Sequence, residues 1–172
     1  LLLQTQGGLA LLAKGELARQ EAELLAVGGA GGGEQRLADA RETLRSAIER
    51  LQVVARDIAT QMRTQAPANA TGLLSPLELS ALQRNVQYQL ARAYRNQGQS
   101  YPASSPDRVS ALQQATELLA PIAGSDASDS LAWQSRLDEI VCLPLVHVSA
   151  GAGLPLAHRD DPDHAAGWAE GR

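Results

Sequence analysis

Hydrophobic residues recur along most of the chain at the three- and four-residue spacing that is typical of amphipathic helices. The clearest case is residues 82–98, where four apolar residues spaced by four share one helical side: Leu82, Val86, Leu90 and Tyr94. Polar residues occupy the rest of this segment, and Gly98 is a typical helix end. A helix with one apolar side cannot bury that side alone, so the segment predicts helical neighbours.

The same pattern predicts helices over residues 2–27, 34–65, 76–98, 106–123 and 129–143. Ser75 and Ser105 are each followed by proline, which predicts helix starts with a serine cap and proline in the first turn. Residues 144–172 contain three of the eight prolines and all three histidines, and they show no sustained helical period. The sequence therefore predicts an all-α domain over residues 1–143, followed by an irregular or disordered tail.

The pattern also predicts which residues are buried. In the longest predicted helix, apolar residues recur every seven positions, which is typical of a heptad seam: Leu37, Leu44, Leu51 and Ile58. In the first predicted helix we expect five leucines to be buried: Leu9, Leu12, Leu17, Leu24 and Leu25. In the last predicted helix we expect an inward side of Trp133, Leu137, Ile140 and Val141. Stacked antiparallel hairpins and a helical bundle or coiled coil both accommodate these patterns.

Composition agrees with packed helices. Hydrophobic residues make up 44% of the chain but aromatic residues only 3%, so Leu, Ala, Val and Ile must form the core. The net charge of −4 and the pI near 5.3 argue against a nucleic-acid-binding protein, which usually has a basic face. The single cysteine, Cys142, excludes an internal disulfide, and its apolar surroundings predict a buried, unreactive thiol.

The sequence contains no apolar run close to the ~20 residues that a membrane-spanning helix needs. The three leucines at the start are too short for the core of a signal peptide, and the chain does not begin with methionine. We therefore expect the chain to be a fragment of a longer protein. The sequence assigns it no compartment.

Residues with catalytic or ligand-binding chemistry do not form a recognisable motif. The glycines in residues 28–33 are followed by Glu34 and Gln35 rather than by the Gly-Lys-Ser/Thr of a phosphate loop, so we expect a linker. The tail has residue types that bind metals, but proline and glycine interrupt it: His158, Asp160, Asp161, Asp163 and His164. We expect a non-enzymatic protein with no metal and no cofactor.

Short motifs recur at two places in the chain. Residues 11–15 (Leu-x3-Gly) are similar to residues 94–98 (Tyr-x3-Gly), and residues 40–48 are similar to residues 111–119, which precede Pro121. These spacings resemble tetratricopeptide repeats (TPR), helix hairpins in which small residues let helix A and helix B approach closely. The resemblance covers residues 2–143, although the motifs lie further apart than the family period of about 34 residues.

The resemblance implies an all-α solenoid that binds a protein or peptide partner in the groove formed by its A helices. It would bring five side chains to that groove: Asn85, Tyr88, Arg92, Arg95 and Asn96. The expected function is a non-catalytic scaffold or adaptor for protein–protein interaction. The alternative is a structural segment that self-associates through the apolar seam of residues 37–62.

Overall fold

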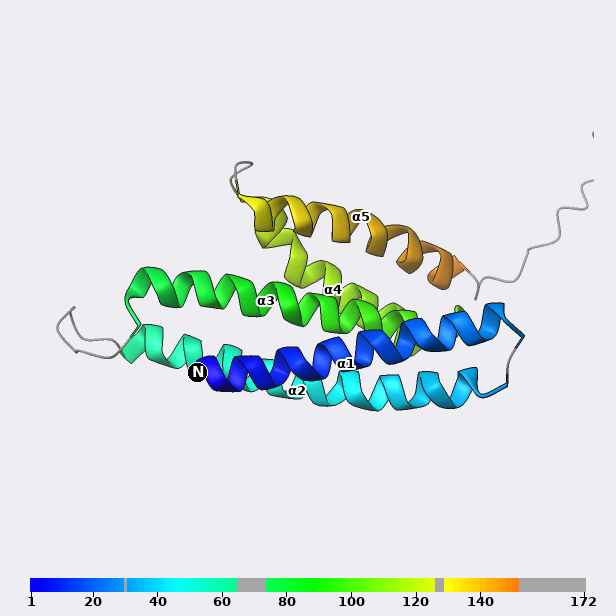
Figure 1. Ribbon diagram of the computed structural model, residues 1–172. Coiled ribbons are helices and arrows are strands. Elements are labelled where there is room, and N and C mark those ends of the chain that lie inside the picture. Colours follow the sequence, from blue (N-terminus) through cyan, green and yellow to red (C-terminus); the bar gives the residue numbers. More distant parts are fainter. Residues whose placement is uncertain (30, 65–73, 126–128, 152–172) are drawn as a thin grey trace, which may run out of the picture.

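A computed structural model describes residues 1–29, 31–64, 74–125 and 129–151 (Figure 1). These residues form helices α1 (Leu2–Val27), α2 (Gly33–Thr64), α3 (Pro76–Gln99), α4 (Pro106–Ala123) and α5 (Ser130–Gly151). The predicted all-α class is confirmed, and the described residues contain no strand. The first four helices begin and end within one residue of the predicted positions.

Helix α5 departs from the prediction at its end. The sequence predicted that the helix stops at Leu143, but it continues through Pro144 to Gly151. An interior proline removes one backbone donor and usually kinks or ends a helix, but Pro144 does not end α5. The rest of the predicted tail, residues 152–172 with its candidate metal ligands, lies outside the described residues.

Local capping explains why helix starts were predicted well. Ser75 Oγ accepts a hydrogen bond from the backbone N–H of Glu78 at 3.3 Å, and Glu78 Oε2 accepts one from the Ser75 N–H at 2.7 Å. This reciprocal capping box satisfies two backbone donors at the start of α3. Ser105 Oγ similarly accepts a hydrogen bond from the N–H of Asp107 at the start of α4.

The helices are arranged as consecutive hairpins in two layers. Each helix packs against the next one in the sequence; α1 also contacts α3, and α3 also contacts α5. Helices α2 and α4, within the described ranges, do not contact each other. Helices α1, α3 and α5 therefore form one layer, and α2 and α4 lie behind it (Figure 1).

The heptad seam of α2 forms the centre of the core. Ala40, Leu44, Ala47, Leu51, Val54 and Ile58 are completely buried. All of them except Ala40 pack in one cluster with Leu12 of α1 and with Leu79, Val86 and Leu90 of α3. The central part of the predicted seam is thus buried, whereas Leu37 at its start is only half-buried and Met62 at its end is 40% exposed. Helices of the same chain cover the buried part. A coiled coil formed through this seam would require those helices to move away.

Glycines bring helices of a hairpin close together. A Cβ on Gly15 would lie 2.6 Å from Leu44 Cγ, and one on Gly8 would lie 2.8 Å from Leu51 Cδ2. In the next hairpin, a Cβ on Gly98 would lie 2.9 Å from the Cγ of Leu112 in α4. Both hairpins therefore place a leucine of the second helix directly over a glycine of the first.

Candidate interaction surface

The polar side of α3 is bonded to α1. Arg92 Nη2 contacts the two carboxylate oxygens of Glu16 at 2.8 and 2.9 Å. Asn96 Nδ2 donates a hydrogen bond to Glu16 Oε1 at 2.7 Å, and Asn96 Oδ1 accepts one from Arg19 Nε at 3.0 Å. Asn96 is buried, so these contacts satisfy a polar side chain that would otherwise be costly to desolvate. The cluster joins the two helices through specific hydrogen bonds.

The same side of α3 is also bonded to α5. Arg95 forms an ion pair with Asp138, and both side chains are less than one fifth exposed. Burial, followed by the negative charge of the Asp138 carboxylate, raises the pKa of the buried Tyr88. The phenol therefore stays neutral at physiological pH beside the ion pair.

A second ion pair lies at the start of α5. Arg84 of α3 binds Asp129 and donates a hydrogen bond to Ser125 Oγ at 3.0 Å. Asp129 Oδ1 also accepts a hydrogen bond from the backbone N–H of Leu131 at 2.9 Å. That hydrogen bond, followed by the contact with Arg84, lowers the pKa of Asp129. Asp129 consequently caps α5 while it also connects α5 to α3.

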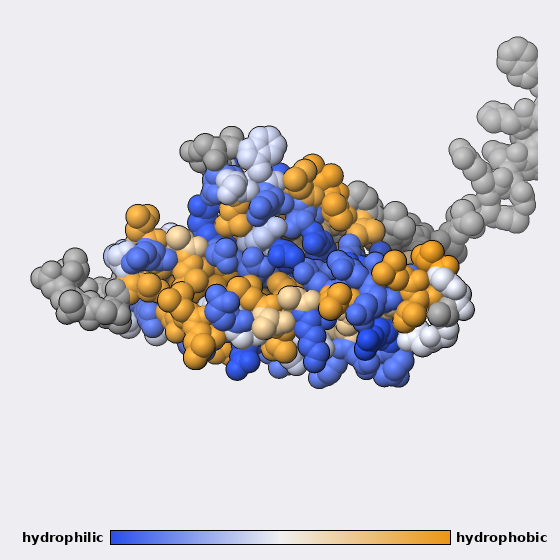
Figure 2. Space-filling view, in the orientation of Figure 1, coloured by the Kyte–Doolittle hydropathy of each residue, from blue (hydrophilic) through white to orange (hydrophobic). Residues whose placement is uncertain are grey.

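These contacts define the positions of the five predicted partner-binding residues. The structure brings Arg92 and Asn96 together at α1 and Tyr88 and Arg95 together at α5, while Asn85 is exposed. Figure 2 shows a mainly hydrophilic band between α1 and α5 on this side of the molecule. Four of the five side chains therefore make contacts within the chain, and their contact with a partner remains a prediction.

Helix α5 exposes the side that was predicted to face inward. Trp133, Leu137, Ile140 and Val141 are 55%, 61%, 64% and 47% exposed. Its fully buried residues are the smaller Ala132, Ser135 and Cys142, and Leu131 and Leu145 are partly buried beside them. The prediction was wrong because apolar spacing identifies a helical side but does not reveal that a neighbouring helix packs against small residues instead. We call the four exposed side chains the α5 apolar face.

In helix α1 as well, some residues that were predicted to be buried are exposed. Leu12 is buried as predicted and Leu9 and Leu25 are half-buried, but Leu17 and Leu24 are exposed. Gly8, Gly15 and Ala22 are buried instead, at intervals of seven residues. Small residues at this spacing let the leucines of α2 approach the α1 backbone, while Leu17 and Leu24 lie on the exposed side.

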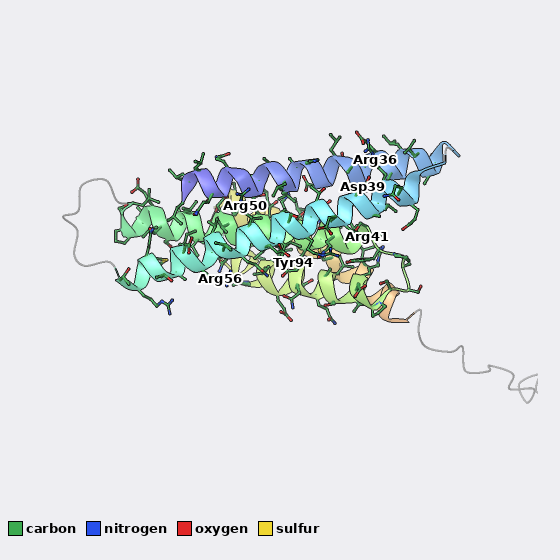
Figure 3. The ribbon with its side chains drawn as sticks, turned by 90° about the horizontal axis from the view of Figure 1, so that it is seen from below. Arg36, Asp39, Arg41, Arg50, Arg56 and Tyr94 are labelled. Carbon is green, nitrogen blue, oxygen red and sulfur yellow. The ribbon has the colours of Figure 1, made fainter. Side chains whose placement is uncertain are left out.

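Charged residues of α2 connect this helix to both neighbours, as Figure 3 shows for Arg36, Arg41 and Arg50. Arg36 Nη2 lies 2.9 Å from Glu21 Oε2 of α1, and the Arg50 guanidinium lies beside Gly7. Arg41 Nη1 donates a hydrogen bond to the Ser100 carbonyl at 2.8 Å. The Tyr94 hydroxyl accepts a hydrogen bond from Gln52 Nε2 at 2.9 Å. These polar groups therefore belong to the packing between helices.

Two hollows of about 440 Å³ each lie along the α1–α2 hairpin. The first is lined by Gln4, Leu11, Ser46, Glu49, Arg50, Val53 and Val54. The second lies at the turn and is lined by Glu21, Leu24, Leu25, Gly28 and Arg36. Neither hollow includes a residue of the α3 polar side.

Cys142 is buried, as its sequence context predicted. Burial raises the pKa of its thiol to about 11, so the unreactive neutral form predominates at neutral pH. Within the part of the chain that the structure describes, His, Cys, Asp and Glu do not gather into a group that could hold a metal ion. None of the described helices combines the length and apolar character required to cross a membrane.

Comparisons with protein-family models, curated proteins and solved structures found no significant match to this chain.

Proposed function

We propose that this chain is a non-catalytic scaffold for protein–protein interaction, built from stacked helix hairpins that resemble TPRs. The observation that carries the proposal is the α1–α3–α5 layer, in which both outer helices hold polar side chains of α3. Side chains that are already fixed lose little conformational entropy when a partner binds. The layer therefore offers a preorganised surface.

The accessible groups on this surface suggest the chemistry of a partner. Asn85 is exposed, and the Arg92 side chain keeps 31% of its surface exposed beside Glu16. Amide and guanidinium N–H groups donate hydrogen bonds to backbone carbonyls and carboxylates. An extended peptide that crosses α3 between α1 and α5 would present such acceptors.

The proposal is tested by capture of partners on the immobilised chain, followed by affinity measurement with each purified partner. The test variant is Asn85→Glu, which adds a repulsive carboxylate at an exposed position. The matched control is Gln113→Glu, at an exposed position on α4. We expect Asn85→Glu to weaken binding by about tenfold or more and the control to leave it unchanged.

Circular dichroism of both variants shows whether each retains the helical fold. A folded Asn85→Glu variant that binds every captured partner as tightly as the unmodified chain would contradict the use of the α3 surface. Failure to recover any partner that distinguishes the two variants would count against the scaffold function.

The alternative function, self-association, is supported by a different surface from the one expected. The seam of α2 is covered by α1 and α3 within the chain. The α5 apolar face, in contrast, is exposed. Self-association through α5 does not exclude partner binding on α3, because the two sets of side chains differ.

A further inference from the structure

The α5 apolar face groups large apolar side chains on the outside of the last described helix. Leu137 and Ile140 are each more than 60% exposed, and Val141 is 47% exposed. The guanidinium of Arg136 lies 5.1 Å from the centre of the Trp133 ring at one end of the face. Figure 2 shows hydrophobic surface along α5 in this region. Exposed apolar groups at this density are typical of protein interaction sites.

The spacing of the face suits another helix. Trp133, Leu137 and Ile140 follow one another at intervals of four and three residues, which is the spacing of a coiled-coil seam. Two of the charged residues of α5 are bonded to other groups of the chain. Arg136 donates hydrogen bonds to the carbonyls of Ala123 and Ser125, and Asp138 binds Arg95. The four side chains of the α5 apolar face are themselves uncharged, so an apolar helix can pack directly on them.

We propose that the α5 apolar face is a dimerisation surface on which α5 of a second copy packs antiparallel, around a two-fold axis. In this arrangement Leu137 lies beside Ile140 of the other copy, and Ile140 beside its Leu137. The interface is made by the same apolar face on both copies. Each face is then covered by the other, so the assembly closes at two chains. A face of this composition is self-complementary because it contains no charge that must find an opposite one.

The exposed area agrees with a dimer of modest affinity. If a fully exposed large side chain offers roughly 200 Å², the four residues leave about 450 Å² accessible on each copy. Two faces together would bury about 900 Å², close to the ~1,000 Å² that separates specific interfaces from incidental contacts. The dimer is therefore expected to be weak and concentration-dependent.

Sedimentation velocity of the full 172-residue chain, at concentrations from about 1 to 200 μM, is the first test. We expect the mean sedimentation coefficient to rise from that of a monomer toward that of a dimer, with no larger species. A monomer at all concentrations would overturn the proposal. Species that grow beyond a dimer would overturn the two-fold arrangement.

Matched variants identify the surface. Leu137→Glu combined with Ile140→Glu changes two exposed positions of α5 and should shift dimerisation to at least tenfold higher concentration. Leu17→Glu combined with Leu24→Glu makes the same change at two exposed positions of α1 and should have no effect. Circular dichroism checks that both proteins remain helical. Equal loss of dimer in both proteins would indicate head-to-tail association and overturn the proposal.

Disulfide trapping tests the register. Chains that carry Leu137→Cys, mixed with chains that carry Ile140→Cys, should form the mixed disulfide faster than either chain forms its own disulfide. The native Cys142 is buried and does not compete. The antiparallel pairing would be overturned if the mixed disulfide formed no faster than the disulfides of each variant with itself. It would also be overturned if no disulfide formed at concentrations that give a dimer. Because none of these substitutions changes α3, failure here leaves the proposed scaffold function to be judged by the Asn85 test.

Discussion

Leu44 of α2 lies directly over Gly15 of α1, where a Cβ on the glycine would be only 2.6 Å from Leu44 Cγ. The contact is buried on both sides, so the leucine has little room to move. The glycine weakens α1 as an isolated helix by about 1 kcal/mol relative to alanine. Close packing against α2 explains why the helix tolerates it.

Gly15→Ala is expected to destabilise the fold by about 1 kcal/mol or more, because overpacking exceeds the gain in helix propensity. The control is Gly7→Ala in the same helix. There the added methyl meets only the end of the flexible Arg50 side chain, at 3.1 Å from Nη1. Gly7→Ala should be neutral or stabilising by up to ~1 kcal/mol. Urea unfolding followed by circular dichroism measures both, and equal effects would contradict the packing argument.

The contact between Arg92 and Glu16 should contribute measurably to stability. A double-mutant cycle with Arg92→Gln and Glu16→Gln is expected to give a coupling energy of about 1 kcal/mol, because the pair is partly buried and makes two short contacts. The more exposed pair of Arg45 and Glu42 on α2 should give at most ~0.5 kcal/mol. A coupling energy for the Arg92 pair no larger than for this control would contradict a role in joining α1 to α3.

Cys142 should make stability depend on alkaline pH. Burial raises the pKa of its thiol from an ordinary 9.0 to about 11 in the folded chain. Between pH 9 and 11 the unfolded chain loses this proton before the folded chain does, so the free energy of unfolding falls as pH rises. Cys142→Ala should remove this contribution, and the two stability curves should converge across this range. Curves that stay parallel would contradict the assignment.

Ser75→Ala should destabilise the start of α3 by about 1 kcal/mol, since the capping hydrogen bond to the Glu78 N–H is lost. Ser104→Ala, at an exposed position in the loop before α4, provides a control that should change stability by less than ~0.5 kcal/mol. Thermal unfolding of both variants measures the difference. An equal shift in both would mean that the cap is not stabilising.

The helices were predictable because their signals are local. Ser75 and Ser105 mark helix starts within a few residues, and the heptad spacing in α2 identifies its buried side. The outward sides of α1 and α5 were not predictable in this way. Leu17 and Leu137 follow a helical apolar pattern, but the residues that pack are the smaller ones across the helix. Periodicity distinguishes two sides of a helix, whereas only the neighbouring helix determines which of them is covered.

The candidate site shows the same limit. The five residues predicted to bind a partner lie on α3, and the groups that contact them within the chain are distant in sequence. Glu16 precedes Arg92 by 76 residues, and Asp138 follows Arg95 by 43. No local pattern reveals such pairings. The sequence does show acidic residues on α1 and α5 that could pair with these arginines. From sequence alone, however, such a residue cannot be distinguished from an acidic residue exposed to solvent.

Helix α3 contacts each of the other four helices, whereas α1 and α2, over the described residues, do not contact α4 or α5. Among the described residues, α3 is therefore the element that connects α1 and α2 with α4 and α5. Arg92 and Arg95 lie one turn apart and bind Glu16 and Asp138 on opposite sides. A change in the position of α5 would therefore reach α1 by way of α3, which two ion pairs join to α5 (Arg84–Asp129 and Arg95–Asp138) and one joins to α1 (Arg92–Glu16).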